Sequence, residues 1–326
     1  MLLSFALAIG QGQWSPTRGA EAERDALFPR LHVGQTFTYI VQYRTQKKVK
    51  TESRVVTPSG PQNVQSDAKW TLSLEILDVR PQGSRSAIHA RAQLQSVDSA
   101  AVAQNALGQK TSPSSGSQAS AKAVEFTILP DGRTEAVTGL DGLFPEQREA
   151  WQQWLRQFAI AGAFPGGAIK RGRSWKSTEV EQAPSPIARL QWEKQATYVR
   201  DEPCAAVPPP SAPDGGVSGN SQPQTCAVVL TRAVLKQKSS PKDTTPEDFK
   251  LHGLRTTGIA NGTNETISYI SLQSGLIVRV TEDAKQFMDV VIAKADGSNQ
   301  VHYNVDANSH TSILLVDNSS AGLAKP

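Results

Sequence analysis

The sequence predicts a mainly β (α+β) fold, with two consecutive curved antiparallel β halves, half-barrel-like, and one amphipathic helix between them. Most of the chain alternates apolar and polar residues with the period of two typical of half-buried strands, and turn sequences separate these segments. One segment near the middle repeats its apolar residues with a helical period instead. At 326 residues the chain can bury a large core, although Ser-, Gly-, Pro- and Ala-rich stretches lower its hydrophobic content to 38%.

The linking helix is predicted within residues 143–168. Its apolar stripe has members at positions i, i+3, i+4 and i+7, namely Trp151, Trp154, Leu155 and Phe158. Pro145 suits the first helical position, and Gly162 followed by Pro165 is a stop signal. A stripe that carries two tryptophans needs an apolar surface against it, so we expect the helix to lie between the two β halves.

The first β half is predicted over residues 31–142. Its first strand places four large residues on one face, namely Phe37, Tyr39, Val41 and Tyr43. Trp70–Val79 and Ala87–Val97 alternate in the same way around a Pro–Gly turn, which predicts a hairpin with one wet face.

Residues 99–122 interrupt this half. They form a low-complexity Ser/Ala/Gln/Gly stretch, which predicts a disordered insertion. Val124–Leu129 and Thr134–Val137 then predict a second hairpin, because Pro130–Gly132 supplies the residues of a tight turn.

The second β half, residues 169–316, begins as the first one does. Gly172 and Trp175 repeat the spacing of Gly34 and Phe37: a glycine, two polar residues and an aromatic residue that opens a strand. This faint repetition leaves open whether the two halves arose by internal duplication.

Further strands are predicted through the rest of this half. They are Ile187–Arg200, Cys226–Lys236, Thr266–Leu272, Leu276–Asp283, Met288–Ala293 and His310–Val316. Thr245–Asp248 is an N-cap sequence that predicts one short helical turn. Residues 317–326 are predicted to be a disordered tail.

The N-terminal residues 1–30 are predicted to be signal-like or disordered. The apolar run Leu2–Ile9 is too short for a bilayer, which needs about 20 residues. Ala6–Ala8 and Ala20–Ala22 have the small-x-small form of a signal-peptide cleavage site. No cysteine follows the run, so a lipoprotein anchor is not expected. A periplasmic or secreted location is therefore predicted, with no integral membrane segment.

The two cysteines agree with export. Cys204 and Cys226 bracket a Pro/Gly/Ser-rich loop, and their flanks resemble adjacent strands that would bring the sulfurs together. There is no CxxC sequence and no histidine close by, which argues against metal binding. We predict a disulfide across the loop.

Several function classes find no support in the sequence. The net charge is +4, and the basic runs at 47–50 and 170–173 lack the context of a nucleic-acid motif. No nucleophile elbow, phosphate loop or dinucleotide fingerprint occurs, and the S-x-x-K letters at Ser239–Lys242 are expected in a loop. Neighbouring acids such as Asp201 and Glu202 point to opposite faces of a strand. We predict no catalytic residue and no cofactor.

The histidines do not predict a metal site. No two of the five stand at i+2 or i+4 spacing. His302 and His310 would converge only if they lay on paired strands. We predict no metal ligand.

A family resemblance rests on the order of these elements. The Gly34–Phe37 strand start, the helix that ends near Pro165, the second start at Gly172–Trp175 and the strands over Thr257–Asp283 resemble exported bacterial all-β proteins of unknown function. These are similar in shape to LolA/LolB-type lipoprotein carriers. The resemblance implies a strongly curved antiparallel sheet that wraps a helix, and no catalytic residues.

The large aromatic residues give the candidate ligand site. They gather around the helix and the strand starts, and six form the predicted site: Tyr39, Trp151, Trp154, Phe158, Trp175 and Trp192. A packed aromatic core explains them as well as an apolar cleft does. We predict a non-enzymatic envelope protein that binds an apolar small molecule or a protein partner in a concave sheet. The alternatives are a scaffold with a fully packed core, or a hydrolase with carboxylates from separate strands.

Overall fold

The structure is a computed structural model of the chain. It describes a large part of the sequence, namely residues 27–53, 61–82, 85–104, 110–111, 123–130, 133–141, 148, 151, 154–155, 169–181, 185–204 and 225–320. The predicted leader (1–30) lies mostly outside these residues, as do most of the linking helix and the loop between the cysteines.

Twelve strands and one short helix are defined by their bounds. The first six strands are β1 (Gln35–Ser53), β2 (Gln62–Gln82), β3 (Arg85–Gln104), β4 (Lys110–Thr111), β5 (Ala123–Ile128) and β6 (Thr134–Thr138). The remaining strands are β7 (Ser174–Val180), β8 (Leu190–Pro203), β9 (Thr225–Gln237), β10 (Leu254–Ser271), β11 (Ile277–Lys294) and β12 (Val301–Ser320). Helix α2 (Glu247–Leu251) precedes β10.

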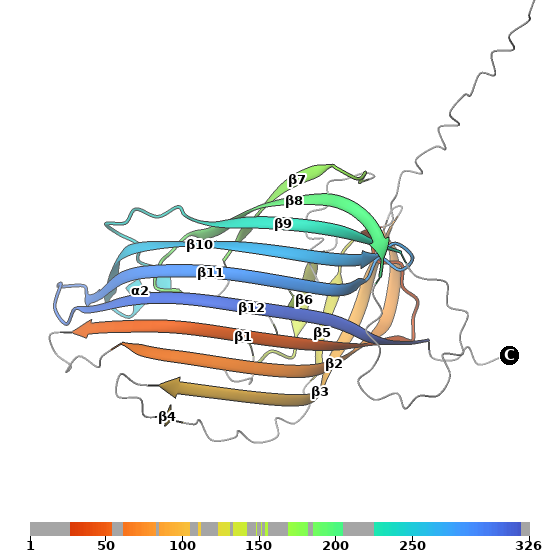
Figure 1. Cartoon of the computed structure of the whole chain (residues 1–326). Coiled ribbons are helices and arrows are strands. Elements are labelled where there is room, and N and C mark those ends of the chain that lie inside the picture. Colours follow the sequence, from red (N-terminus) through yellow and green to blue (C-terminus); the bar gives the residue numbers. More distant parts are fainter. Residues whose placement is uncertain are drawn as a thin grey trace, which may run out of the picture.

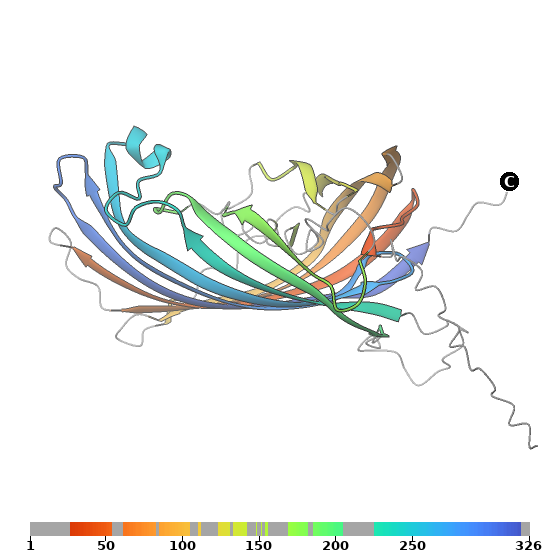
Figure 2. The same cartoon turned by 90° about the horizontal axis from the view of Figure 1, so that it is seen from above.

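All strands belong to one antiparallel sheet. Its order is β6-β5-β3-β2-β1-β12-β11-β10-β9-β8-β7, with β4 paired to β3. The last strand pairs with the first over their whole length, so the two predicted halves join edge to edge (Figure 1). Seen from above, the sheet bends into an open trough (Figure 2). The predicted fold class, mainly antiparallel β and strongly curved, is confirmed.

The two strand starts share one local geometry. Gly34 and Gly172 have φ values of 83° and 78°, a left-handed conformation that glycine adopts without strain. The N–H of Gly34 donates to the carbonyl of Ile76 at 2.9 Å, and the N–H of Gly172 donates to that of Tyr198 at 2.7 Å. In each case a left-handed turn attaches the new strand to its neighbour.

The described part of the linking helix covers the inner face of the trough. Arg148, Trp151, Trp154 and Leu155 are helical, and the last three are buried. The ring of Trp154 meets Phe126 edge-on at 5.8 Å and Tyr39 at 6.5 Å between centroids. The stripe therefore packs on β1 and β5, while Phe158 lies outside the described residues.

Several strands are longer than predicted. β1 continues to Ser53 and β3 to Gln104, which reaches into the expected insertion, and β12 spans Val301–Ser320 rather than His310–Val316. The two strands predicted at Leu276–Asp283 and Met288–Ala293 are one strand, β11. For β1 the reason is physical: its backbone ladder continues over Lys47–Ser53, where most side chains on both faces are polar and the apolar alternation gives little signal.

The disulfide between Cys204 and Cys226 is confirmed, with a Cα–Cα distance of 5.0 Å. Cys226 lies in β9 opposite Glu202 of β8, and Cys204 follows the end of β8 directly. The predicted hairpins β2/β3 and β5/β6 and the pair β8/β9 are also present.

We expect Trp154→Ala to lower the free energy of unfolding by about 3–5 kcal/mol, because a fully buried ring would leave a cavity. Leu251→Ala, at a side chain that is 85% exposed, should change it by less than about 0.5 kcal/mol. Chemical denaturation of both variants measures this. A loss below about 1 kcal/mol for Trp154→Ala would contradict the packing.

Removing the disulfide should also destabilise the protein. It closes a loop with a sequence separation of 22, for which loop entropy predicts about 3 kcal/mol. The Cys204→Ser/Cys226→Ser variant should unfold at correspondingly lower denaturant concentration. Unreduced wild-type protein should resist alkylation, and prompt labelling of both thiols would refute the bridge.

Candidate functional site

The inner face of the trough carries three hydrophobic clusters. The helix cluster surrounds Trp154 and includes Tyr39 and Phe126. A second cluster joins Leu27 and Phe28 to the β7–β9 side of the sheet. A third lies around Trp192 and Val290. Each is packed, so none of them by itself provides an open apolar cleft.

Between these clusters the inner face changes character. Cross-strand register places two rows of side chains next to each other, here called the central rows. One row is Lys47, Ala307, Gln286 and Gly262, and the other is Thr45, Ser309, Ala284 and Asn264. On β10, β11 and β12, one row holds a polar residue where the other holds Ala or Gly. Small and polar side chains therefore alternate both along the strands and across them.

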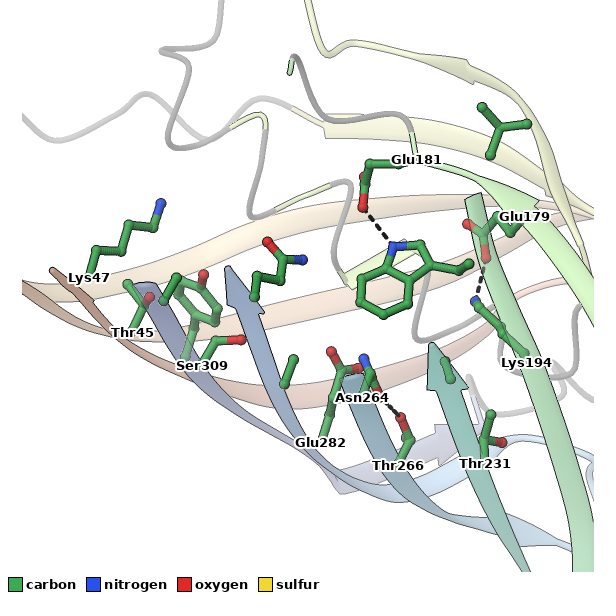
Figure 3. A pocket seen from close by; sticks show the side chains of 17 residues that line it. Thr45, Lys47, Glu179, Glu181, Lys194, Thr231, Asn264, Thr266, Glu282 and Ser309 are labelled. Carbon is green, nitrogen blue, oxygen red and sulfur yellow. Dashed lines mark hydrogen bonds and ion pairs between the residues drawn. The ribbon is translucent and has the colours of Figure 1, made fainter. Parts of the chain in front are cut away.

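A cavity of about 150 Å³ lies over the central rows. Figure 3 shows Thr45 of β1, Ser309 of β12 and Asn264 of β10 facing this space, with Lys47 at one side. Tyr43, Trp192 and Val180 complete the apolar part of its wall. The cavity is thus lined by both polar and apolar side chains.

Edge strand β7 and the residue after it form one wall. Glu179 makes an ion pair with Lys194 of β8, and Glu181 Oε2 accepts a hydrogen bond of 2.7 Å from Trp192 Nε1 (Figure 3). The indole lies over Gly262, where an added Cβ would be 3.4 Å from Trp192 Cη2, an ordinary contact distance, but only 2.9 Å from the backbone oxygen of Lys285. These contacts fix the indole at the side of the cavity.

A buried carboxylate lies beside the central rows. Glu282 of β11 is only 6% exposed and is flanked across the strands by Thr266 and Thr311. Thr266 Oγ1 donates to Asn264 Oδ1 at 2.9 Å, which orients the amide. The arrangement offers hydrogen-bond donors and acceptors from four strands, as a recognition site requires.

The structure distributes the five described members of the predicted site over all three clusters. Tyr39, Trp151 and Trp154 come together in the helix cluster, Trp175 belongs to the second and Trp192 to the third. Phe158 lies outside the described residues. Of the five described, Trp192 lines the cavity.

Tyr39 is an anchor of the core. Its hydroxyl donates to the carbonyl of Ile277 at 3.1 Å, and its complete burial raises its pKa. A ligand role for the aromatic residues stays a prediction.

The polar lining was not predicted from the sequence. A signal exists in β11, where the inward positions after Val280 are Glu282, Ala284 and Gln286 before the apolar ones resume. Assigning every second residue of the whole strand to the inner face would have revealed this polar lining.

The histidines lie apart from the cavity lining. His302 and His310 occupy different positions along β12, so they do not converge. His302 Nε2 lies 2.8 Å from Asp289 Oδ1, and His310 Nδ1 lies 2.8 Å from Asp283 Oδ1. Among the described residues, no group of three or more His, Cys, Asp or Glu side chains is placed to hold a metal ion.

Two further features of the described residues concern the S-x-x-K letters and membrane spans. Ser239–Lys242 lies in a turn, where Ser240 forms an isolated bridge with Asp243, rather than at a helix start. In the described part of the chain, no helix is long and apolar enough to cross a bilayer.

Acid should weaken the pairing of Asp289. Hydrogen bonds from His302 and Asn304 lower the pKa of this carboxyl below its ordinary value. The contribution to stability is therefore complete above the unfolded pKa of about 4 and is lost as the pH falls through the lower folded value. Asp289→Asn should reduce stability at pH 7 and flatten the acid loss in denaturation curves. An unchanged acid slope, equal to that of Asp306→Asn, would contradict this.

Comparison with known proteins gives distant likenesses. No protein-family model and no curated protein matches the chain. A structure that concerns lipid–protein interactions in lipovitellin has a TM-score of 0.45 at 10% identity and covers 91% of this chain, which spans only 26% of the lipovitellin chain. A Bacteroides fragilis protein with a YmcC-like fold, described as exported, has a TM-score of 0.26 at 8% identity, covering 90% of this chain and 98% of that one. An outer-membrane channel of Pseudomonas putida has 0.23 at 10% identity, covering 88% and 97%. At TM-scores this low the likenesses carry no argument, and the resemblance to lipoprotein carriers stays a prediction.

Proposed function

We propose that the chain is an exported, non-enzymatic binding protein that holds a small amphiphilic molecule in the cavity of its concave sheet. The observation that carries the proposal is the group of short side chains at the centre of the inner face, at Ala307, Ala284 and Ala233. The disulfide supports an extracytoplasmic location, because such bonds persist in oxidising compartments.

The short residues matter because the surrounding positions are filled. On the same face, Val280 and Val290 of β11 are completely buried in clusters on either side of the cavity. A sequence selected for packing alone would be expected to place residues of similar size between them, since unfilled space costs stability. A hollow kept at this position favours a ligand over a core that serves stability only.

The mixed lining favours an amphiphile over a purely apolar molecule. Tyr43, Trp192 and Val180 offer apolar surface, while Asn264 and Ser309 offer hydrogen bonds to the same space. A purely apolar ligand would bury these polar groups without partners, at a cost of about 1–3 kcal/mol each.

A scaffold protein is the second candidate. The tight packing around Trp154, which is 1% exposed, favours it, because most of the inner face is filled by the chain itself. A scaffold needs no ligand in the cavity, so ligand binding separates the two proposals.

Filling the cavity should abolish binding. The protein should bind the small neutral dye N-phenyl-1-naphthylamine, and Ala284→Leu should weaken that affinity at least about tenfold, because the added atoms occupy the space. Thr263→Leu is the matched control, since Thr263 is exposed on the outer face of the adjacent strand.

Fluorescence titration of both variants, with thermal unfolding to confirm folding, makes the measurement. Failure of the wild-type protein to bind the dye, together with no amphiphile in an organic extract of protein from its native compartment, would reject the proposal.

A further inference from the structure

We infer that the polar part of the ligand is a neutral, polyhydroxylated group, as in a sugar headgroup. The inference rests on the proposed function and names the chemistry of the molecule that occupies the cavity. It follows from the placement of four polar side chains and from the balance of charge around them.

The four side chains come from four consecutive strands of the sheet. Lys47 (β1), Ser309 (β12), Gln286 (β11) and Asn264 (β10) line the cavity as successive diagonal neighbours across the central rows. Diagonal neighbours in a sheet stand roughly 7–8 Å apart, which leaves room for a sugar-sized ring to contact the polar ends of several of them.

The positions between them are small. Ala307 and Ala284 leave space on the floor, so a ring-sized group can approach all four polar side chains at once. Larger residues there would separate the polar groups from any ligand.

The donors and acceptors suit hydroxyl groups. Gln286 and Asn264 carry amides, which both donate and accept, and Ser309 carries a hydroxyl that does the same. Within the described part of the chain, no hydrogen bond engages the side chains of Gln286 and Ser309, and Asn264 uses its oxygen for Thr266. A sugar hydroxyl also donates and accepts, so it can satisfy either side of an amide.

Charge argues against an anionic headgroup. Lys47 is the cation that the cavity offers without an ion pair among the described residues, while Glu179, Glu181 and Glu282 also line the space. An anion at Lys47 would meet this excess of carboxylates.

Charge also argues against a cationic headgroup. Glu179 is already paired with Lys194, and Glu181 accepts a hydrogen bond from the indole of Trp192. Lys47 and Lys194 add positive charge from opposite sides of the cavity (Figure 3). A headgroup without net charge is compatible with both the carboxylates and the lysines of the cavity.

The aromatic wall agrees with this choice. Trp192 and Tyr43 face the cavity from opposite sides of the central rows. Aromatic side chains with a polar tip offer an apolar surface beside a hydrogen-bonding edge. A sugar likewise has apolar C–H faces and a polar rim.

Four amphiphiles with one tail test the headgroup. Octyl β-D-glucoside, octanoate, octylammonium and tetraethylene glycol monooctyl ether share an eight-carbon chain and differ in the head. Calorimetric titration below the micelle concentration should give the tightest binding for the glucoside, by about tenfold over the charged pair. Methyl β-D-glucoside, which lacks the tail, distinguishes a free glycan from a glycolipid source.

A variant pair localises the effect. Gln286→Met/Ser309→Ala keeps the shape of the floor and removes two polar groups, and it should weaken glucoside binding about tenfold while leaving the ether unchanged. Gln42→Met/Ser312→Ala makes the same two substitutions at a cross-strand pair on the outer face and should change neither.

The outcomes separate the two proposals. Equal binding of all four amphiphiles, or tightest binding of octanoate with its loss in Lys47→Met, would overturn the headgroup inference and leave the proposed function standing. Binding of methyl glucoside as tight as that of octyl glucoside would support the headgroup and reject the amphiphile. Binding of none of these compounds would reject both.

Discussion

The pairing of β1 with β12 is the contact on which the molecule depends. It joins the first and last strands over nineteen registered residue pairs, from Gln35 with Ser320 to Ser53 with Val301. Without it the chain would be two separate meanders, each with an additional exposed edge. With it the chain has one wide sheet, and the twist of so many strands bends that sheet into a trough. An inner face large enough for both a core and a cavity follows from this one ladder.

The apolar inner face of the trough has to be covered, and other segments of the chain cover only parts of it. Trp154 closes one region by edge contacts with aromatic rings, and the segment at Leu27 and Phe28 closes another. The outer face needs no cover, since cross-strand ion pairs such as Arg232–Glu265 and Arg44–Asp67 keep it hydrated. The space left over, above Ala284 and its neighbours, is where side chains remain short.

Sequence reasoning predicted those features that depend on local pattern. The alternation at Phe37 and Tyr39, the turn glycine Gly172 and the Cys204–Cys226 bridge each carry a short-range signal, and the structure has all of them. The end of β1 was not predicted, because most side chains of Lys47–Ser53 are polar on both faces and give little apolar alternation, although the backbone pairs with β12 throughout. A single sequence carries no signal for the register between strands that are far apart in the chain. The pairing of β1 with β12, which joins the two halves, was therefore not predicted.

The polar lining of the cavity was not predicted for a related reason. Aromatic residues are prominent in a sequence and drew the prediction to residues such as Tyr39 and Trp175, which lie in different packed clusters. A cavity forms where side chains are small, and a single alanine such as Ala284 or Ala307 gives no signal of a cavity in the sequence. Their role is visible only in the register of β11 and β12. There Ala284 and Ala307 are diagonal neighbours, and Gln286 and Ser309 occupy the other diagonal. In a wide sheet, therefore, the inward-facing residues of neighbouring strands have to be compared row by row. A binding surface is recognised where small side chains replace the large apolar ones on the inner face.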